Sequence, residues 1–222
     1  MTKIYIVRHC EALGNVMRIF QGTTDLDISE LGAKQLEFLK KRFENKKIDR
    51  VLSSPLIRAR KTAEAVIGQK NIPLEILDNL IELNGGIVEG RPFIEAFNDN
   101  PELLDAWNNH PEDFAPKNGE KMRDAYERIW NTLIKVVKEN RNKTVVLSTH
   151  GGLTRCLNCR LLYGDIANLK NTPWAENTAV SLIEFDDKLN PNVIFYNNVS
   201  HLPKEFINKK SRIIKTIEGG KQ

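Results

Sequence analysis

Short apolar runs alternate with amphipathic segments along most of the chain. Four runs have the length and polar flanks of a buried strand, namely residues 4–7, 49–53, 74–77 and 143–149. Apolar residues recur at helical spacing in the segments 29–43, 55–68 and 119–140, and again after residue 152. The runs 179–185 and 192–196 predict a terminal antiparallel pair. This alternation predicts an α/β fold, a three-layer α/β/α sandwich around a mixed, mostly parallel sheet.

Punctuating residues set the expected ends of two helices. Ser54-Pro55 has the form of an N-cap followed by a first-turn proline, and Gly68 fits the C-cap of the same helix. Gly119-Glu120 is expected to open the long helix that follows. The pattern therefore predicts helices that begin directly at Pro55 and Gly119.

The whole of 1–222 is predicted to be a single domain. Two of its segments do not follow the alternation of strands and helices. Residues 92–118 predict short helices in an inserted lid or lobe. Its aromatics suit either stacking on a ligand or the core of a small lobe, and the core is favoured: Phe93, Phe97, Trp107 and Phe114. Residues 200–222 are basic and predict a surface helix or a frayed tail.

Composition narrows the class of protein without identifying it. The 222 residues are 41% hydrophobic and 28% charged, and the net charge of +4 is spread along the chain, which gives nucleic-acid binding no support. The three cysteines argue against a disulfide scaffold and favour a reducing, cytoplasmic compartment. Cys156 and Cys159 are interpreted as core thiols one helical turn apart rather than half a zinc site. No signal sequence or membrane-length apolar run is apparent.

Cations and imidazoles follow three of the predicted strands. The first strand ends in Arg8-His9, the second leads to a helix with Arg58 in its first turn, and the fourth ends in His150-Gly151-Gly152. Ligands of open α/β sheets bind outside the carboxyl ends of the strands. Two arginines, two histidines and helix N-termini at one edge predict a site for a dianionic phosphate.

These residues belong to a set of motifs that resembles the histidine phosphatase (phosphoglycerate-mutase-like) superfamily from residue 3 to about residue 185. The motifs are Val7-Arg8-His9-Cys10-Glu11 with Asn15, Gln21-Gly22 with Asp25, Leu31-Gly32 with Gln35, Ser53-Ser54-Pro55 through Arg58-Ala59 and Thr62-Ala63, Glu82 with Glu89-Gly90, Gly119-Glu120, and Ser148-Thr149-His150-Gly151-Gly152. The pattern departs from the family at one place, because Cys10 stands where glycine is usual. Its side chain is expected either to be a tolerated small residue, to crowd the nucleophile, or to form a redox-sensitive thiol of lowered pKa.

The resemblance implies a role for each site residue. His9 is the expected nucleophile, and it is expected to become a phosphohistidine. Arg8, Arg58 and a protonated His150 are expected to surround the phosphoryl oxygens, so that neither a metal nor another cofactor is needed. Glu82, on a strand-like segment, is the candidate general acid and base. The expected substrate-binding residues are Asn15, Gln21, Gly22 and Gly151.

Several functions remain open at this level. The segment after Glu82 resembles the phosphatase branch, which implies a phosphomonoesterase that acts on a small phosphorylated metabolite. Members of that branch act on sugar phosphates, phosphoglycerates and α-ribazole phosphate. A phosphoglycerate mutase and a non-catalytic phospho-ligand-binding relative are the alternatives. The terminal strand pair suits either a homodimer edge or a covered edge.

Overall fold

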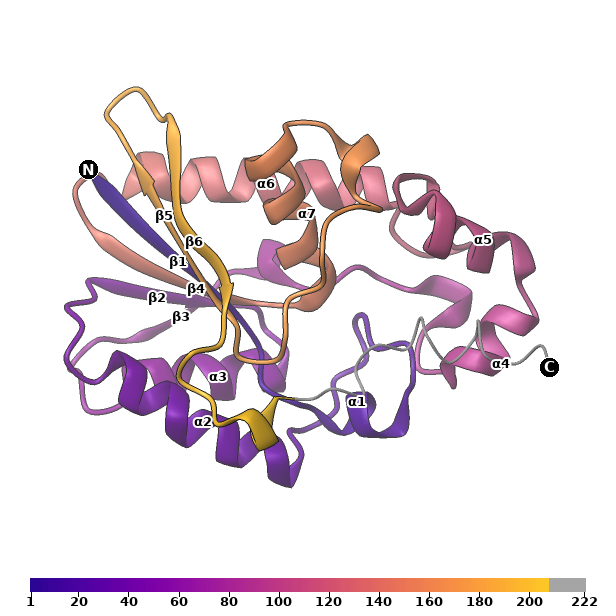
Figure 1. The fold of residues 1–222 in the computed structure, drawn as a ribbon, viewed down its shortest axis with the longest axis horizontal. Coiled ribbons are helices and arrows are strands. Elements are labelled where there is room, and N and C mark those ends of the chain that lie inside the picture. The colour runs from indigo at the N-terminus through magenta and orange to yellow at the C-terminus, as the bar shows by residue number, and fades with distance from the viewer. Residues whose placement is uncertain (208–222) are drawn as a thin grey trace.

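The computed structural model describes residues 1–207, and these fold around one six-stranded sheet (Figure 1). The strands are β1 (Thr2–Arg8), β2 (Arg50–Ser53), β3 (Leu74–Ile76), β4 (Thr144–Thr149), β5 (Val180–Phe185) and β6 (Pro191–Asn198). Their order is β3-β2-β4-β1-β5-β6. The first four neighbours in this order pair in parallel, whereas β5 is antiparallel to both β1 and β6. The mixed, mostly parallel sheet is therefore confirmed.

Helices cover both faces of the sheet, which gives the three predicted layers. The α-helices are α1 (Leu13–Met17), α2 (Glu30–Phe43), α3 (Ile57–Ile67), α4 (Phe93–Asn98), α5 (Pro101–Asn109), α6 (Met122–Glu139) and α7 (Gly151–Tyr163). Helices α2 and α3 lie on one side of the sheet and α6 and α7 on the other (Figure 1). The short 3-10 helices are η1 (Asp78–Leu80), η2 (Gly86–Val88), η3 (Pro111–Asp113), η4 (Ile166–Asn168) and η5 (Lys204–Phe206).

Strand β1 shows why both faces are buried. Ile4 and Ile6 belong to the cluster beneath α6 and α7, whereas Tyr5 and Val7 belong to the cluster beneath α2 and α3. Successive strand residues point to opposite faces, so a strand covered on both sides reads as a continuous apolar run. Because β4 lies between β1 and β2, the carboxyl ends of these three parallel strands meet at one edge.

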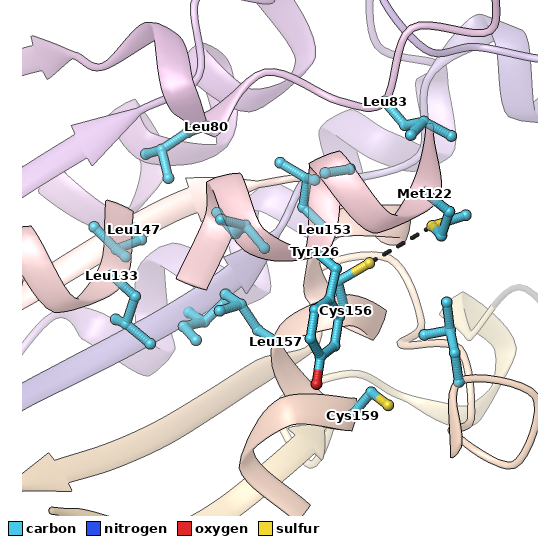
Figure 2. Packing of buried hydrophobic residues seen from close by; sticks show 14 of the residues in the cluster. Leu80, Leu83, Met122, Tyr126, Leu133, Leu147, Leu153, Cys156, Leu157 and Cys159 are labelled. Atoms are coloured by element: carbon cyan, nitrogen blue, oxygen red, sulfur yellow. Dashed lines mark hydrogen bonds between the residues drawn. The ribbon is translucent and has the colours of Figure 1, made fainter. Parts of the chain in front are cut away.

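Cys156 and Cys159 lie in the hydrophobic core beside residues of α6 and α7 (Figure 2). Cys156 and Cys159 are 1% and 0% exposed, and Cys156 Sγ lies 3.7 Å from Met122 Sδ. Burial raises the pKa of both thiols. The interpretation as core thiols is confirmed. Within residues 1–207, no three His, Cys, Asp or Glu side chains are grouped as a metal site.

The 92–118 segment forms α4, α5 and η3 at the end of the molecule opposite the N-terminus (Figure 1). Phe97 and Phe114 are fully buried, and Phe93 and Phe97 have ring centroids 4.5 Å apart. The prediction that these aromatics form a core is confirmed for these three rings, which pack in the same cluster as Ile4 and Ile6. A lid function of this segment stays a prediction.

Three local expectations are wrong. The helix after Ser54-Pro55 begins at Ile57 with Leu56 as its N-cap, because the Ser54 hydroxyl accepts from the Leu56 N–H at 3.3 Å while the Ile57 N–H donates to Asp25. Helix α6 begins at Met122, since the Glu120 N–H donates to the Asn84 carbonyl instead of opening a helix. Glu82 follows η1 in non-strand backbone.

Only part of the segment 200–222, which was predicted as a surface helix or a frayed tail, lies within the described residues. Residues 200–207 contain η5, and residues 208–222 of the predicted basic tail lie outside the described residues. No helix in the described part of the chain is both long enough and apolar enough to cross a membrane.

Candidate active site

His9 lies directly after β1 and is 4% exposed. Its Nδ1 lies 2.6 Å from the Cys10 carbonyl oxygen. A carbonyl can only accept, so Nδ1 carries the proton and Nε2 keeps its lone pair. Burial, and then the charges of Arg58 and Arg8, hold the pKa of His9 well below its ordinary value. The imidazole is therefore neutral and has one nucleophilic nitrogen.

Arg8 is anchored from the opposite side of the site. Its Nη1 donates to the Ala175 carbonyl, and its side chain packs on the first turn of α7. A Cβ at Gly151 would lie 3.2 Å from Arg8 Cζ, so glycine permits this close approach. Burial lowers the pKa of Arg8, and the carboxylates of Glu82 and Glu176 oppose that shift.

Arg58 is fully buried near the start of α3. Its guanidinium donates to the carbonyls of Gly22 and Thr24 at 2.7 and 2.9 Å, and more weakly to Gln21 at 3.4 Å. Burial lowers the pKa of Arg58 to about 10, so the group remains a cation at neutral pH. The positive charge is fixed in place by backbone oxygens.

His150 is the N-cap residue of α7 and follows β4. Its ring centroid lies 5.2 Å from that of His9, and its Nε2 lies 2.7 Å from Ser54 Oγ. Burial, followed by the charge of Arg58, holds the pKa of His150 well below its ordinary value. The expectation of a protonated imidazole is therefore wrong for this structure, in which His150 is neutral. Because opposite charges stabilise the protonated form, an oxyanion beside the ring would raise its pKa.

Glu82 occupies the N-terminus of α7. Its Oε2 accepts from the Gly152 N–H at 2.8 Å, and its Oε1 accepts from Leu83 and Leu153 at 2.9 and 3.3 Å. A Cβ at Gly152 would lie 2.7 Å from Oε1, so a side chain there would displace the carboxylate. The Gly152 amide, expected to approach a phosphate, instead holds the candidate acid beside the arginines.

The predicted substrate-binding residues differ in whether hydrogen bonds within the protein already occupy their polar groups. Asn15 Oδ1 accepts from the Ala12 N–H at 3.0 Å and thereby caps α1. The N–H of Gly22 donates to Glu89 at 2.9 Å and its carbonyl accepts from Arg58, so Gly22 shapes the cradle through its backbone. The buried amide atoms of Gln21 have no hydrogen-bond partner among the described residues, and binding of a substrate by Gln21 stays a prediction.

Sequence reasoning missed several residues that organise this site. Asn177 donates to the His9 carbonyl at 3.1 Å, and Ser54 Oγ is hydrogen-bonded to His150 Nε2 at 2.7 Å. Glu89 accepts from the N–H groups of Gly22 and Thr24, both at 2.9 Å, and from Gly85 at 2.7 Å. Ser54 and Glu89 stood in recognised motifs, so their positions were a usable signal. Asn177 gave no such signal, because it stands in none of these motifs.

Cys10 does not crowd the nucleophile and is no redox-sensitive thiolate. It is fully buried, its Sγ lies in the direction of Gly32, and burial raises its pKa to about 12. The positive-φ residues of the described chain do not include Cys10, so its backbone position does not require glycine. The interpretation as a tolerated small residue is the one that fits.

A protonated, buried thiol is expected to resist alkylation. We expect iodoacetamide at pH 7.5 to modify Cys10 at least about a hundredfold more slowly in the native protein than in urea, because the thiolate is the reactive form. Peptide mass spectrometry over time measures this rate. Equal rates in the two conditions would contradict the assignment of a buried, neutral Cys10.

Three neutral histidines, His9, His150 and His201, make stability depend on pH. An unfolded histidine titrates near about pH 6.5, whereas folded His9 and His150 have pKa values well below that. The unfolded state therefore binds more protons below this pH, so the free energy of unfolding should be highest above about pH 6.5 and fall between about pH 6.5 and 5. Urea unfolding at several pH values measures it. His9→Asn should reduce the slope and the exposed control His110→Asn should not; a flat profile would refute the assignment.

Comparisons with known proteins show the family of this chain. The sequence model of the histidine phosphatase superfamily (branch 1) matches residues 4–198. Phosphoserine phosphatase 1 of Hydrogenobacter thermophilus is 30% identical over 210 residues, which cover 93% of this chain and 97% of that protein. The phosphoglycerate mutase-like protein 4 of Arabidopsis thaliana is 29% identical and covers 90% of this chain and 86% of its own.

Solved structures give the same fold. YhfR of Bacillus stearothermophilus superposes with a TM-score of 0.86 at 30% identity and covers 90% of this chain and 99% of its own. The α-ribazole phosphatase of Shigella flexneri, at 22% identity and 88% and 96% coverage, has a TM-score of 0.79. The chain belongs to branch 1 of the histidine phosphatase superfamily, as its motifs predicted, and is an enzyme of the phosphatase class.

Proposed function

We propose that the protein is a metal-independent phosphomonoesterase that hydrolyses a small phosphorylated metabolite through a phosphohistidine at His9. The observation that carries the proposal is the state of His9: its Nδ1 is bonded to the Cys10 carbonyl, and its depressed pKa leaves Nε2 unprotonated. An unprotonated nitrogen between cations is suited to attack phosphorus, because the cations attract the phosphate while the lone pair stays free.

In the first step, Nε2 of His9 forms a bond to phosphorus while the bond from phosphorus to the leaving oxygen breaks. Arg8 and Arg58 stabilise the charge on the phosphoryl oxygens, and His150 donates to them once the anion raises its pKa. Glu82 gives a proton to the leaving oxygen. Its position on the α7 N-terminus keeps it within the same group of charges.

In the second step, water replaces the leaving group. Glu82 takes a proton from water, the new oxygen–phosphorus bond forms, and the bond to Nε2 breaks. The two arginines remain cationic throughout and supply the positive charge that a metal provides in other phosphatases. No step of this sequence therefore calls for a cofactor.

The substrate class is a phosphomonoester of a small hydroxyl compound, and phosphoserine is the first member to test. The H. thermophilus relative at 30% identity is a phosphoserine phosphatase, and an E. histolytica phosphoserine phosphatase with this fold has been solved with phosphoserine. A panel of phosphoserine, phosphoglycerates, sugar phosphates and α-ribazole phosphate, with His9→Ala as the blank, ranks the candidates by kcat/KM. No phosphate release from any of them would overturn the proposal.

A phosphoglycerate mutase is the second candidate, since it shares the phosphohistidine and differs only in the acceptor. The relationship to the A. thaliana mutase-like protein keeps this candidate open. Interconversion of 3- and 2-phosphoglycerate, measured beside phosphate release, separates the two. Rapid interconversion without net phosphate release would replace the phosphatase by the mutase.

We further propose a cytoplasmic location on the basis of the three free, buried cysteines, which suit a reducing compartment.

A homodimer through the exposed edge of β6 remains a proposal. Sedimentation of the purified protein tests it directly.

A further inference from the structure

A turn from the far end of the chain holds the backbone of the nucleophile. The side-chain amide of Asn177 and the N–H of Thr178 both donate to the His9 carbonyl, at 3.1 and 3.3 Å. The turn is closed by the Ala179 N–H, which donates to the Glu176 carbonyl at 3.0 Å. Since the imidazole extends from this backbone, the turn contributes to where Nε2 lies.

The turn has an unfavourable residue at its critical position. Thr178 is fully buried and has a φ of 57°, in the left-handed region that β-branched residues rarely adopt. Such a conformation persists only where the surroundings hold it in place. One side-chain contact of Thr178 comes from His201, whose Nε2 lies 3.2 Å from Thr178 Oγ1.

The state of His201 is fixed by Arg42. Arg42 Nη1 lies 2.9 Å from His201 Nδ1, and arginine can only donate. Nδ1 is therefore the acceptor, and Nε2 carries the proton that it donates to Thr178 Oγ1. Burial, assisted by Arg42, lowers the pKa of His201 to about 4, so the neutral form persists at physiological pH.

The same C-terminal segment reaches the other side of the nucleophile loop. Gln35 is fully buried, and its Nε2 donates to the Phe206 carbonyl at 2.9 Å while its Oε1 accepts from the Glu11 N–H at 2.9 Å. Arg42 is itself tied to this segment through the Asn198 carbonyl at 3.0 Å. Residues that follow β6 are thus linked to the backbone of residues 9 and 11 through two different side chains, Thr178 and Gln35.

We propose that His201 is a positioning residue for the nucleophile: it holds Thr178 in the left-handed turn that fixes the His9 backbone. The proposal rests on the proposed function, in which His9 attacks phosphorus. His201 lies beyond residue 198, where the match to the superfamily ends, so the family pattern does not assign it. Its action is geometric, since nothing places it in contact with His9 itself.

Kinetics with p-nitrophenyl phosphate test the proposal. In His201→Ala, kcat should fall at least about tenfold while KM stays within about twofold, because a misplaced nucleophile affects the transition state more than binding. His201→Gln should keep most of the activity, since its amide N–H can reach Thr178. The exposed His110→Ala is the matched control and should leave kcat unchanged.

Thr178→Val completes a double-mutant cycle, because valine keeps the branched shape and removes only the hydroxyl. The single variants should lose similar activity, and the combination with His201→Ala should lose no more than either. Strictly additive losses, or an unchanged kcat in His201→Ala, would overturn the proposal. If His201→Ala fails to fold, Thr178→Val and His201→Gln carry the test.

A readout independent of activity separates this proposal from the proposed function. Ring ¹⁵N chemical shifts of His9 should change in His201→Ala and stay constant in His110→Ala. If the wild-type protein releases no phosphate and these shifts still change, the proposed function fails and the positioning role stands. Unchanged shifts together with unchanged kcat refute the positioning role.

Discussion

Replacing His9 with alanine is expected to lower phosphate release from p-nitrophenyl phosphate by at least about a thousandfold. The variant lacks Nε2 of His9, which is unprotonated because Nδ1 carries the proton that it donates to the Cys10 carbonyl. The backbone of residue 9 should stay in place, because its N–H donates to Thr149 at 2.9 Å and its carbonyl is held by Asn177. Release of p-nitrophenol measures the loss.

The control is His110→Ala, which removes an exposed imidazole from the 92–118 segment. Radiolabelled phosphate should remain on the wild-type protein after rapid denaturation in alkali, and His9→Ala should retain none. If His9→Ala kept more than about a tenth of the activity, the nucleophile would have to be another group.

Glu82→Gln is expected to give the second-largest loss, about a hundred- to ten-thousandfold in kcat for an alkyl phosphate such as phosphoserine. Glutamine keeps the size of the side chain, and its carbonyl oxygen can still accept from Gly152, so the fold should be retained. What it lacks is a transferable proton. Steady-state kinetics with a series of leaving groups measures the effect.

The leaving group makes this prediction specific. p-Nitrophenolate leaves readily without protonation, so Glu82→Gln should cost less with p-nitrophenyl phosphate than with phosphoserine. Glu139→Gln, which changes an exposed carboxylate at the end of α6, should behave as wild type. An equal loss with both substrates would remove Glu82 from the role of general acid.

The main fold elements could be predicted because their cause is local. The apolar run of β1 reflects burial on both faces, and Ile4 to Val7 indeed divide between two clusters. Element ends depend on distant partners and were predicted less well. The Ile57 N–H, at the first residue of α3, donates to Asp25 across 32 residues, and no local pattern encodes that bond.

The site shows the same division. The alternation of strands and helices predicts that Arg8, His9 and His150 lie at the carboxyl ends of parallel strands, near Arg58. The strand order that places β4 between β1 and β2 was not predicted. The protonation state of His150 was not foreseeable. His150 is neutral because it is fully buried near the charge of Arg58. Neither its burial nor its closeness to Arg58 can be predicted from the residues beside it in the sequence.

The loop around Arg58 is hydrogen-bonded by both a cation and an anion. Arg58 donates to the carbonyls of Gly22 and Thr24, while Glu89 accepts from the N–H groups of the same two residues. The N–H and the carbonyl of one residue belong to neighbouring peptide groups, so the two opposite charges hold consecutive peptides of the loop, and the Glu89 charge also acts on Arg58 directly. An incoming phosphate thus finds a cation whose conformational entropy was already lost on folding, and more of the binding free energy remains for catalysis.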